Sequence, residues 1–297
     1  MKITIPALLI LACWPIAAQT ANKPVVLVVS ADTENYLLSA GGTIAAMIDK
    51  GALAYVIRVT NDEKDAWDLS PEEAAHRTRA ESEQAAAILG VKEVISLGYR
   101  SAELADVPFT SLRDRLMVYI RHYRPTVMFI PNPYTEYDRV LDRYYTGRAA
   151  EDAWRAASFE NYLPPFGAAG LKPHLTPELY YYAQPFDPRR REPESTATFV
   201  PEPKVFDISE TFERKLKAVQ AMKTANHSTA MRLKARLSST GRRLPLLAEI
   251  NDASMNRLIE ENVRGLAKIA AAATSYPLAE EFRYAGVSYR IPAKYLQ

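Results

Sequence analysis

Residues 25–49 read VVLVVSADTENYLLSAGGTIAAMID, and this stretch decides the fold. It opens with a continuous apolar run, Val25 to Val29, which is typical of a parallel strand buried on both faces. A polar segment at residues 30–35 follows, and then a helix. In an open α/β sheet, the segment that leaves the carboxyl end of the first strand usually holds binding and catalytic groups. That segment carries three candidate groups and no histidine: Asp32, Glu34 and Asn35.

Strand and helix patterns alternate along the rest of the chain. Apolar runs predict further strands at residues 54–60, 94–97, 126–130 and 179–183. Helical patterns cover residues 71–89 (opened by Ser70 and Pro71, closed by Gly90), 111–123, 144–158, 208–237 and 253–273. This alternation predicts an α/β fold, a Rossmann-like three-layer domain with a mainly parallel sheet. No composition break indicates a second domain, so residues 19–297 are expected to form one.

Residues 1–18 are predicted to be a signal peptide. Lys2 supplies the positive charge, residues 3–14 the apolar segment, and Ile16-Ala17-Ala18 the cleavage site before Gln19. The mature protein is therefore expected to be exported, to the periplasm or the cell exterior. A retained anchor, or a lipoprotein modified at Cys13, fits this segment less well. Cys13 is the only cysteine, so the mature chain would have no disulfide and no thiolate metal site.

The composition argues against several partners. Of the 297 residues, 48% are hydrophobic and 24% are charged, with a formal net charge of +2. This balance indicates a soluble protein and does not favour binding to nucleic acid or to an anionic membrane. No apolar run after the signal segment is long enough to span a bilayer.

Several motifs, in fixed order, resemble the PIG-L/LmbE family of metal-dependent sugar N-deacetylases. In that family the first strand ends in His-Pro-Asp-Asp-Glu, a few residues before Gly-Gly-Thr-Ile. Aligning on Gly-Gly-Thr-Ile at residues 41–44 places residues 32–36 (DTENY) on the five family positions. The other matching blocks are Arg-Ala-Glu at 79–81, Leu-Gly-Tyr at 97–99, and Val-Leu-Asp-Arg at 140–143 before Thr-Gly-Arg-Ala at 146–149.

The resemblance implies a role for each matching residue. It puts the zinc-ligand positions at Asp32, Asn35 and Arg143, and the general base, which activates the metal-bound water, at Glu34. A histidine that aids the oxyanion or the leaving amine is replaced by Val140, beside the retained Asp142. The resemblance further implies that Arg79 and Tyr99 contact the substrate, a small molecule or glycan.

These substitutions remove the metal chemistry of the family. Catalytic zinc takes three nitrogen or carboxylate ligands and an open position. Asn35 offers a neutral amide, and the guanidinium of Arg143 is always protonated and accepts nothing. We therefore expect no zinc or other cofactor, and a forked ion pair from Arg143 to Asp32 or Glu34 in place of the metal. The alternative is a calcium or magnesium site of oxygen ligands, including Asp142, against which the charge of Arg143 argues.

Other conspicuous residues have structural alternatives. Arg79 is as well explained by a surface pair with Glu83 as by substrate contact. Asp62 follows the second predicted strand and is expected to cap a loop. Asp142 is expected to pair with Arg143 or Arg139. The tyrosines around the last block are predicted to pack in the core in at least two cases, or else to stack on a sugar: Tyr134, Tyr137, Tyr144 and Tyr145.

Three classes of function remain open at this point. The first is an amide hydrolase that deacetylates an acetamido sugar or glycoconjugate, with lost or strongly reduced zinc-dependent activity. The second is an exported pseudoenzyme that binds a glycan. The third is a cation-binding module. The resemblance favours the first two, and the residues of the site favour the second over the first.

Overall fold

The computed structural model describes residues 23–134, 140–183 and 203–286. The predicted signal segment, with Cys13, lies outside them, so export stays a prediction. The strands form one sheet in the order β3-β2-β1-β4-β5-β7-β6. Their bounds are β1 (Val25–Ser30), β2 (Leu53–Thr60), β3 (Glu93–Tyr99), β4 (Val127–Pro131), β5 (Glu178–Tyr182), β6 (Lys204–Asp207) and β7 (Ala279–Tyr284).

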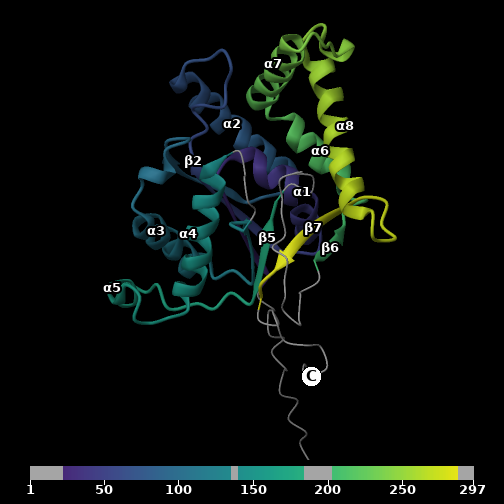
Figure 1. Ribbon diagram of the computed structural model, residues 1–297. Coiled ribbons are helices and arrows are strands. Elements are labelled where there is room, and N and C mark those ends of the chain that lie inside the picture. Colours follow the sequence, from purple (N-terminus) through teal and green to yellow (C-terminus); the bar gives the residue numbers. More distant parts are fainter. Residues whose placement is uncertain (1–22, 135–139, 184–202, 287–297) are drawn as a thin grey trace, which may run out of the picture.

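Helices cover both faces of the sheet (Figure 1). They are α1 (Thr33–Asp49), α2 (Pro71–Leu89), α3 (Phe109–Tyr123), α4 (Leu141–Ala157), α5 (Pro164–Ala168), α6 (Phe212–Gln220), α7 (Lys223–Ser239) and α8 (Asp252–Ala271), with short 3₁₀ turns η1 (Leu104–Asp106) and η2 (Pro245–Leu247). One core lies between the sheet and α1, α2, α6 and α8, and the other lies between the sheet and α3 and α4. The predicted three-layer α/β fold is confirmed.

The sheet is parallel from β3 to β5, and only its far edge is antiparallel. β1 pairs in parallel with β2 and β4, whereas β7 runs antiparallel to β5 and to β6. Side chains of β1 alternate between the two cores, with Val26 and Val28 on one face and Leu27 and Val29 on the other. Burial on both faces explains why this strand is uniformly apolar.

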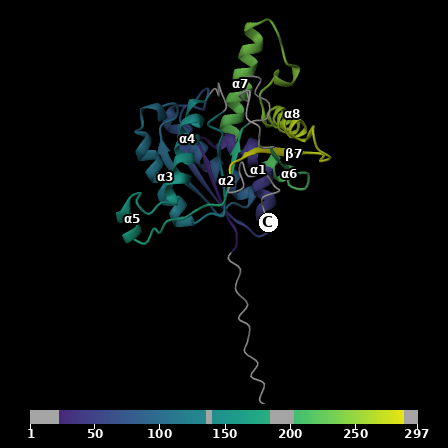
Figure 2. The same cartoon turned by 60° about the horizontal axis from the view of Figure 1, so that its bottom comes forward.

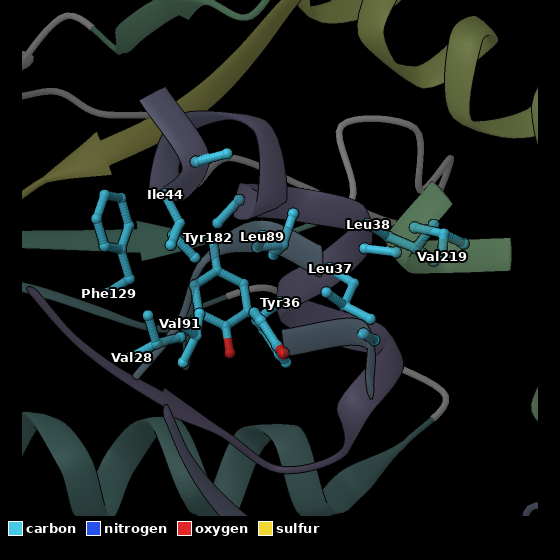
Figure 3. Packing of buried hydrophobic residues seen from close by; sticks show 14 of the residues in the cluster. Val28, Tyr36, Leu37, Leu38, Ile44, Leu89, Val91, Phe129, Tyr182 and Val219 are labelled. Carbon is cyan, nitrogen blue, oxygen red and sulfur yellow. The ribbon is translucent and has the colours of Figure 1, made fainter. Parts of the chain in front are cut away.

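The first core is built around the sheet and the amino-terminal half of α1. Figure 3 shows Tyr36 of α1 beside Tyr182 of β5, with Phe129 and Ile44 in the same cluster. Tyr182 donates a hydrogen bond of 2.8 Å to the carbonyl oxygen of Val29. The hydroxyl of Tyr36 is buried without a hydrogen-bond partner. The start of α1 is therefore packed rigidly against the end of β1.

Two sequence predictions about the second half are corrected here. The helix expected over residues 208–237 is two helices, because the chain turns between Gln220 and Lys223, where Asn226 Nδ2 donates 2.8 Å to the carbonyl of Val219. The helix expected from residue 144 begins at Leu141, so Asp142 and Arg143 lie in its first turn. Strands β6 and β7 were not predicted, since charged residues interrupt their apolar pattern.

A buried ion pair is inserted into the hydrogen-bond ladder of α1. Lys215 Nζ lies 2.8 Å from Glu280 Oε1 and donates 2.7 Å to the carbonyl of Leu38. The carboxylate of Glu280 accepts the backbone amides of Gly42 and Thr43 at 3.0 and 2.8 Å. A side chain at Gly42 would meet Ile208 at 2.8 Å. The Gly-Gly motif thus gives α6 and β7 close access to the backbone of α1.

Candidate functional site

The site lies where the first two strands end and α1 begins. Asp32 is the N-cap of α1, and its Oδ1 accepts the amide of Asn35 at 2.8 Å. A carboxylate here satisfies an amide that the helix leaves unpaired and complements the helix dipole. Glu34 stands in the first turn with its side chain 32% exposed, whereas the side chain of Asp32 is 9% exposed. The sequence prediction that Asp32 follows β1 is confirmed.

Arg143 reaches this carboxylate from α4, on the other side of β1. Its Nε lies 2.8 Å from Asp32 Oδ2, and its Nη2 lies 3.3 Å from Asp32 Oδ1. Nη2 also lies 3.8 Å from Glu34 Oε2. The predicted forked ion pair between Arg143 and Asp32 is confirmed, although the two residues stand 111 positions apart in the chain.

A second buried ion pair supports the same helix end. Arg58 Nη1, from β2, lies 3.2 Å from Asp62 Oδ2, and both side chains are less than 5% exposed. Asp62 Oδ2 also accepts from Thr33 Oγ1 at 3.0 Å and from the Thr33 amide at 3.4 Å. Asp62 therefore caps α1, and its Oδ1 also accepts from Thr60 Oγ1 in its own segment at 3.0 Å. A charged residue within the buried strand β2 was the signal in the sequence, because such a charge requires a partner.

A small open pocket of about 10 Å³ adjoins Glu34. Four carboxyl groups and two hydroxyl groups face a small apolar wall at the start of α7. The lining residues are Thr33, Glu34, Asp62, Asp65, Thr78, Glu81, Met222 and Ala225. Glu81 is held by Thr224, whose hydroxyl donates 2.8 Å to Glu81 Oε1. Glu81 belongs to the matching Arg-Ala-Glu block but was given no role there, and sequence reasoning missed Asp65, which does not stand out until α2 and the loop before it are folded together.

The pocket disfavours negative charge. Burial raises the pKa of Asp65 to about 8, and the charges of Asp62 and Asp32 add to this rise. Burial likewise raises the pKa of Asp62 to about 6, against the opposing charge of Arg58. Burial also raises the pKa of Glu34, and Arg143 is the main opposing charge. The two arginines thus compensate the carboxylates only in part.

Asp142 lies away from the candidate metal position. Its carboxylate accepts the backbone amides of Ala102 and Leu104 at 2.5 and 3.2 Å, and so holds the η1 turn against α4. The prediction that Asp142 pairs with Arg143 is wrong, because these two amides take up its oxygens; Arg139 lies outside the described residues.

The structure places the two predicted substrate-binding residues on other surfaces. Arg79 lies on the exposed face of α2, with its Nε 3.2 Å from Glu83 Oε1, which fits the surface-pair alternative. Tyr99 ends β3, packs against the second core, and carries the guanidinium of Arg115 over its ring at 5.5 Å. Neither residue lines the pocket, and substrate contact by either remains an untested expectation.

Of the flanking tyrosines, Tyr134 and Tyr144 are 45% and 42% exposed. Only Tyr145 packs against a core, so the expectation of two core tyrosines is not met by the three described; Tyr137 lies outside the described residues. Glu151 accepts hydrogen bonds of 2.6 Å from the hydroxyls of Tyr134 and Tyr181. The exposed ring of Tyr134 is therefore held in place from behind.

The side chains at the family's metal position do not fit a zinc ion. Both oxygens of Asp32 accept from Arg143, Asn35 supplies a neutral amide, and Arg143 brings a fixed positive charge. Within residues 23–134, 140–183 and 203–286, no three His, Cys, Asp or Glu side chains are grouped so as to hold a metal ion. Histidines lie elsewhere: His174 Nε2, for example, contacts the carbonyl of Pro125 at 2.7 Å.

A parallel sheet whose first strand delivers carboxylates to a helix N-terminus, opposite a side chain from α4, matches the fold of the LmbE-like deacetylases. The family model of PIG-L, described as GlcNAc-PI de-N-acetylase, matches residues 27–154. The resemblance to the PIG-L/LmbE family found in the sequence is thus confirmed over this part of the chain.

Similar proteins agree with this assignment. Diacetylchitobiose deacetylase of Thermococcus kodakarensis is 28% identical over 199 residues, which cover 66% of this chain and 67% of the relative. The structure of N,N'-diacetylchitobiose deacetylase from Pyrococcus horikoshii, complexed with its inhibitor, superposes with a TM-score of 0.69 at 22% identity, covering 91% of this chain and 87% of that one.

The same fold also serves another reaction. GalB, the 4-carboxy-2-hydroxymuconate hydratase from Pseudomonas putida, matches with a TM-score of 0.58 at 19% identity, covering 89% of this chain and 97% of that one. At these identities the structural matches show the fold, and the reaction has to be argued from the site.

No helix among the described residues is long and apolar enough to cross a membrane.

Proposed function

We propose that this protein binds an acetamido sugar, free or within a glycoconjugate, in a deacetylase-type pocket that has lost or strongly reduced zinc-dependent hydrolysis. The observation that carries the proposal is the forked ion pair between Arg143 and Asp32, which fills the metal position with a cation of the protein's own. We further propose that the mature protein is exported and acts in the cell envelope or outside the cell.

The surroundings of the ion pair support ligand binding. The small pocket beside Glu34 has room for a single hydroxyl group, and the hydroxyl and carboxyl oxygens that line it suit such a group of a sugar lying outside it. The exposed ring of Tyr134, fixed through Glu151, offers a flat apolar face of the kind that stacks on a sugar ring. Groups that can bind a sugar are therefore present, whereas the side chains at the metal position do not suit the metal ion that would activate water for hydrolysis.

Glu34 is the residue on which residual hydrolysis would depend. It keeps a carboxylate at the family position of the general base, 3.8 Å from the guanidinium of Arg143. Without a bound metal, a water beside Glu34 keeps its ordinary, very high pKa. The expected rate of acetate release is therefore far below that of a zinc deacetylase.

The test uses the purified mature chain, residues 19–297. Elemental analysis is expected to find no stoichiometric zinc, and an acetate-release assay on diacetylchitobiose is expected to show no chelator-sensitive turnover. Saturation-transfer NMR is expected to detect binding of the same sugar. One zinc per chain with turnover abolished by chelator contradicts the proposal; so does the absence of any sugar binding. Turnover that survives the chelator would assign metal-free hydrolysis to Glu34 and Arg143.

A restored variant sharpens the test. Asp32→His, Asn35→Asp and Arg143→His together return the family's ligands, and this triple variant is expected to bind one zinc ion. The matched control carries the same three types of substitution at exposed positions, Asp106→His, Asn256→Asp and Arg257→His, and is expected to bind none. Activity of the restored variant is expected to lag, because Val140 leaves the oxyanion without a donor.

A further inference from the structure

We propose that α7 and the segment after it, to residue 248, form a basic arm that docks the protein on an anionic phospholipid surface; α8, which packs against the first core, braces the arm from below. Residues 223–248 contain six lysines and arginines and no aspartate or glutamate. The whole chain has a net charge of only +2, so this segment concentrates positive charge that the remainder balances. The inference concerns a surface beyond the sugar pocket and does not depend on the proposed function.

The arm stands clear of the sheet in both views (Figures 1 and 2). It projects beyond the carboxyl ends of β1 and β2, next to the candidate pocket. Met222 and Ala225, at the base of the arm, form part of the wall of that pocket. A small core of its own, with Ala230, Leu247 and Met255, holds the two helices together. The basic residues therefore stand on a packed helical segment.

The cations near the tip are exposed and have no acidic partner. Arg236, Arg242 and Arg243 are exposed, and among the described residues none of them forms an ion pair. Arg232 and Lys234 donate to neutral oxygens, those of Thr229 and Ala248, and Arg232 is near enough to Glu34 for its charge to lower the pKa of that carboxyl. The acids that face the arm lie near its base: Asp252 lies 3.0 Å from Lys223 Nζ, and Asp68 lies 3.7 Å from His227 Nδ1.

The arginines of α8 form a contrast with those of the tip. Arg257 and Arg264 are each paired with a glutamate four positions away, Glu261 and Glu260. Paired surface charges have little net field beyond a Debye length, whereas unpaired charges of one sign add. The tip of the arm is thus a patch of positive potential.

Apolar side chains beside these arginines favour a lipid surface over a soluble polyanion. Leu237 and Leu246 are half-buried at the tip, outside the small core, and Pro245 between the helices is exposed. Basic residues interleaved with leucine suit the boundary between phosphate headgroups and acyl chains, where both kinds of group find partners. A soluble anionic polymer would use the charges and leave the leucines in water.

The experiment is sedimentation of the purified mature protein with vesicles. One set contains phosphatidylcholine alone, and the other contains phosphatidylcholine mixed with phosphatidylglycerol. Binding is expected only to the second set and is expected to weaken as salt is added. Each arginine near an anionic surface contributes about fivefold in binding, so the variant Arg236→Gln, Arg242→Gln, Arg243→Gln is expected to bind roughly 100-fold more weakly.

The control removes the same charge near the amino-terminal ends of the strands. It carries Lys50→Gln, Lys92→Gln and Lys172→Gln, all at exposed positions. It is expected to bind vesicles like the unmodified protein, and thermal unfolding checks that both variants are folded. Equal loss in the two variants, or no preference for anionic vesicles, overturns the proposal. Binding to soluble polyphosphate without binding to vesicles overturns the lipid assignment. None of these vesicle measurements contains a sugar, so failure of this proposal can be distinguished from failure of the proposed function.

Discussion

Two of the buried ion pairs that hold α1 stand in different surroundings, one at the middle of the helix and one at its N-terminus. Lys215 and Glu280 have side chains only 2% and 3% exposed, and they donate to and accept from the backbone of the helix. Arg143 and Asp32, at its N-terminus, are 11% and 9% exposed and stand next to Glu34, which solvent reaches. We call Lys215–Glu280 the inner pair and Arg143–Asp32 the outer pair. The backbone of α1 supplies further hydrogen bonds to the inner pair, whereas the outer pair borders a pocket.

The two pairs differ in what offsets their loss of hydration. A buried ion pair is tolerated only where further hydrogen bonds offset the loss of hydration. Around Glu280 the amides of α1 supply those bonds. Around Asp32, burial raises the pKa values of Glu34 and Asp65, and the neighbouring carboxyl groups add to this rise. At the outer pair, the carboxyl groups thus outnumber the arginine beside them, and one of them, Glu34, is partly exposed to solvent.

The largest effect is expected from breaking the inner pair. Glu280→Ala leaves the Lys215 ammonium and the amides of Gly42 and Thr43 buried without their acceptor. The variant is expected to lose about 3–5 kcal/mol of unfolding free energy, measured by urea denaturation. The double variant Lys215→Met, Glu280→Met is expected to lose less than the two single changes added together. A loss below about 1 kcal/mol for Glu280→Ala would show that the pair does not hold the helix.

Breaking the outer pair is expected to cost less stability and to change the site more. Arg143→Met removes a forked bond from Asp32, but water can enter and solvate the carboxylate, so we expect a loss of about 2 kcal/mol. The pKa of Glu34 is expected to rise further, because Arg143 is the main charge that lowers it. Carboxyl NMR titration measures that shift.

The control for this variant lies on the same helix. Arg148→Met removes an arginine that is 43% exposed and paired with Glu151 at 3.0 Å. This variant is expected to change the unfolding free energy by less than about 1 kcal/mol and to leave the pKa of Glu34 unchanged. If both variants shift Glu34 equally, Arg143 is not the compensating charge of the site.

The smallest effect is expected from the pocket acid, and it depends on pH. The pKa of Asp65 is raised in the folded protein, from 3.8 to about 8, so the native state binds the proton more tightly. Its contribution to stability is therefore complete below pH ~4 and is lost as the pH rises through ~8. Asp65→Asn is expected to remove this loss and to be more stable than the unmodified protein at pH ~8, by about 1 kcal/mol because the loop is partly exposed.

Thermal unfolding across the pH range checks this expectation. Glu83→Gln, on the exposed face of α2, is the matched control and is expected to leave the pH profile unchanged. Parallel profiles for the unmodified protein and Asp65→Asn would show that the carboxyl group of Asp65 is solvated in the folded state.

Much of the fold was predictable because local signals agreed with it. The apolar run of β1, the N-cap of α2 at Ser70 and its left-handed C-cap at Gly90 all appear in the structure where the sequence puts them. The second half was less predictable. Glu280 faces inward from β7 only because Lys215 and the amides of α1 meet it there, so its charge interrupts the apolar pattern of a real strand.

The sequence by itself determined the parallel sheet, and its resemblance to the family led us to expect an arginine, and no histidine, at the positions of the metal ligands. Residue identity alone fixes these features, because a guanidinium cannot ligate zinc and an apolar run buried on both faces is typical of a parallel strand. Only the tertiary structure decided that Asp62 caps α1, that Asp142 turns to the η1 amides, and that Asp65 lines the pocket. The positions of these acids depend on contacts between segments far apart in the chain, and no local pattern encodes which donor a carboxylate finds.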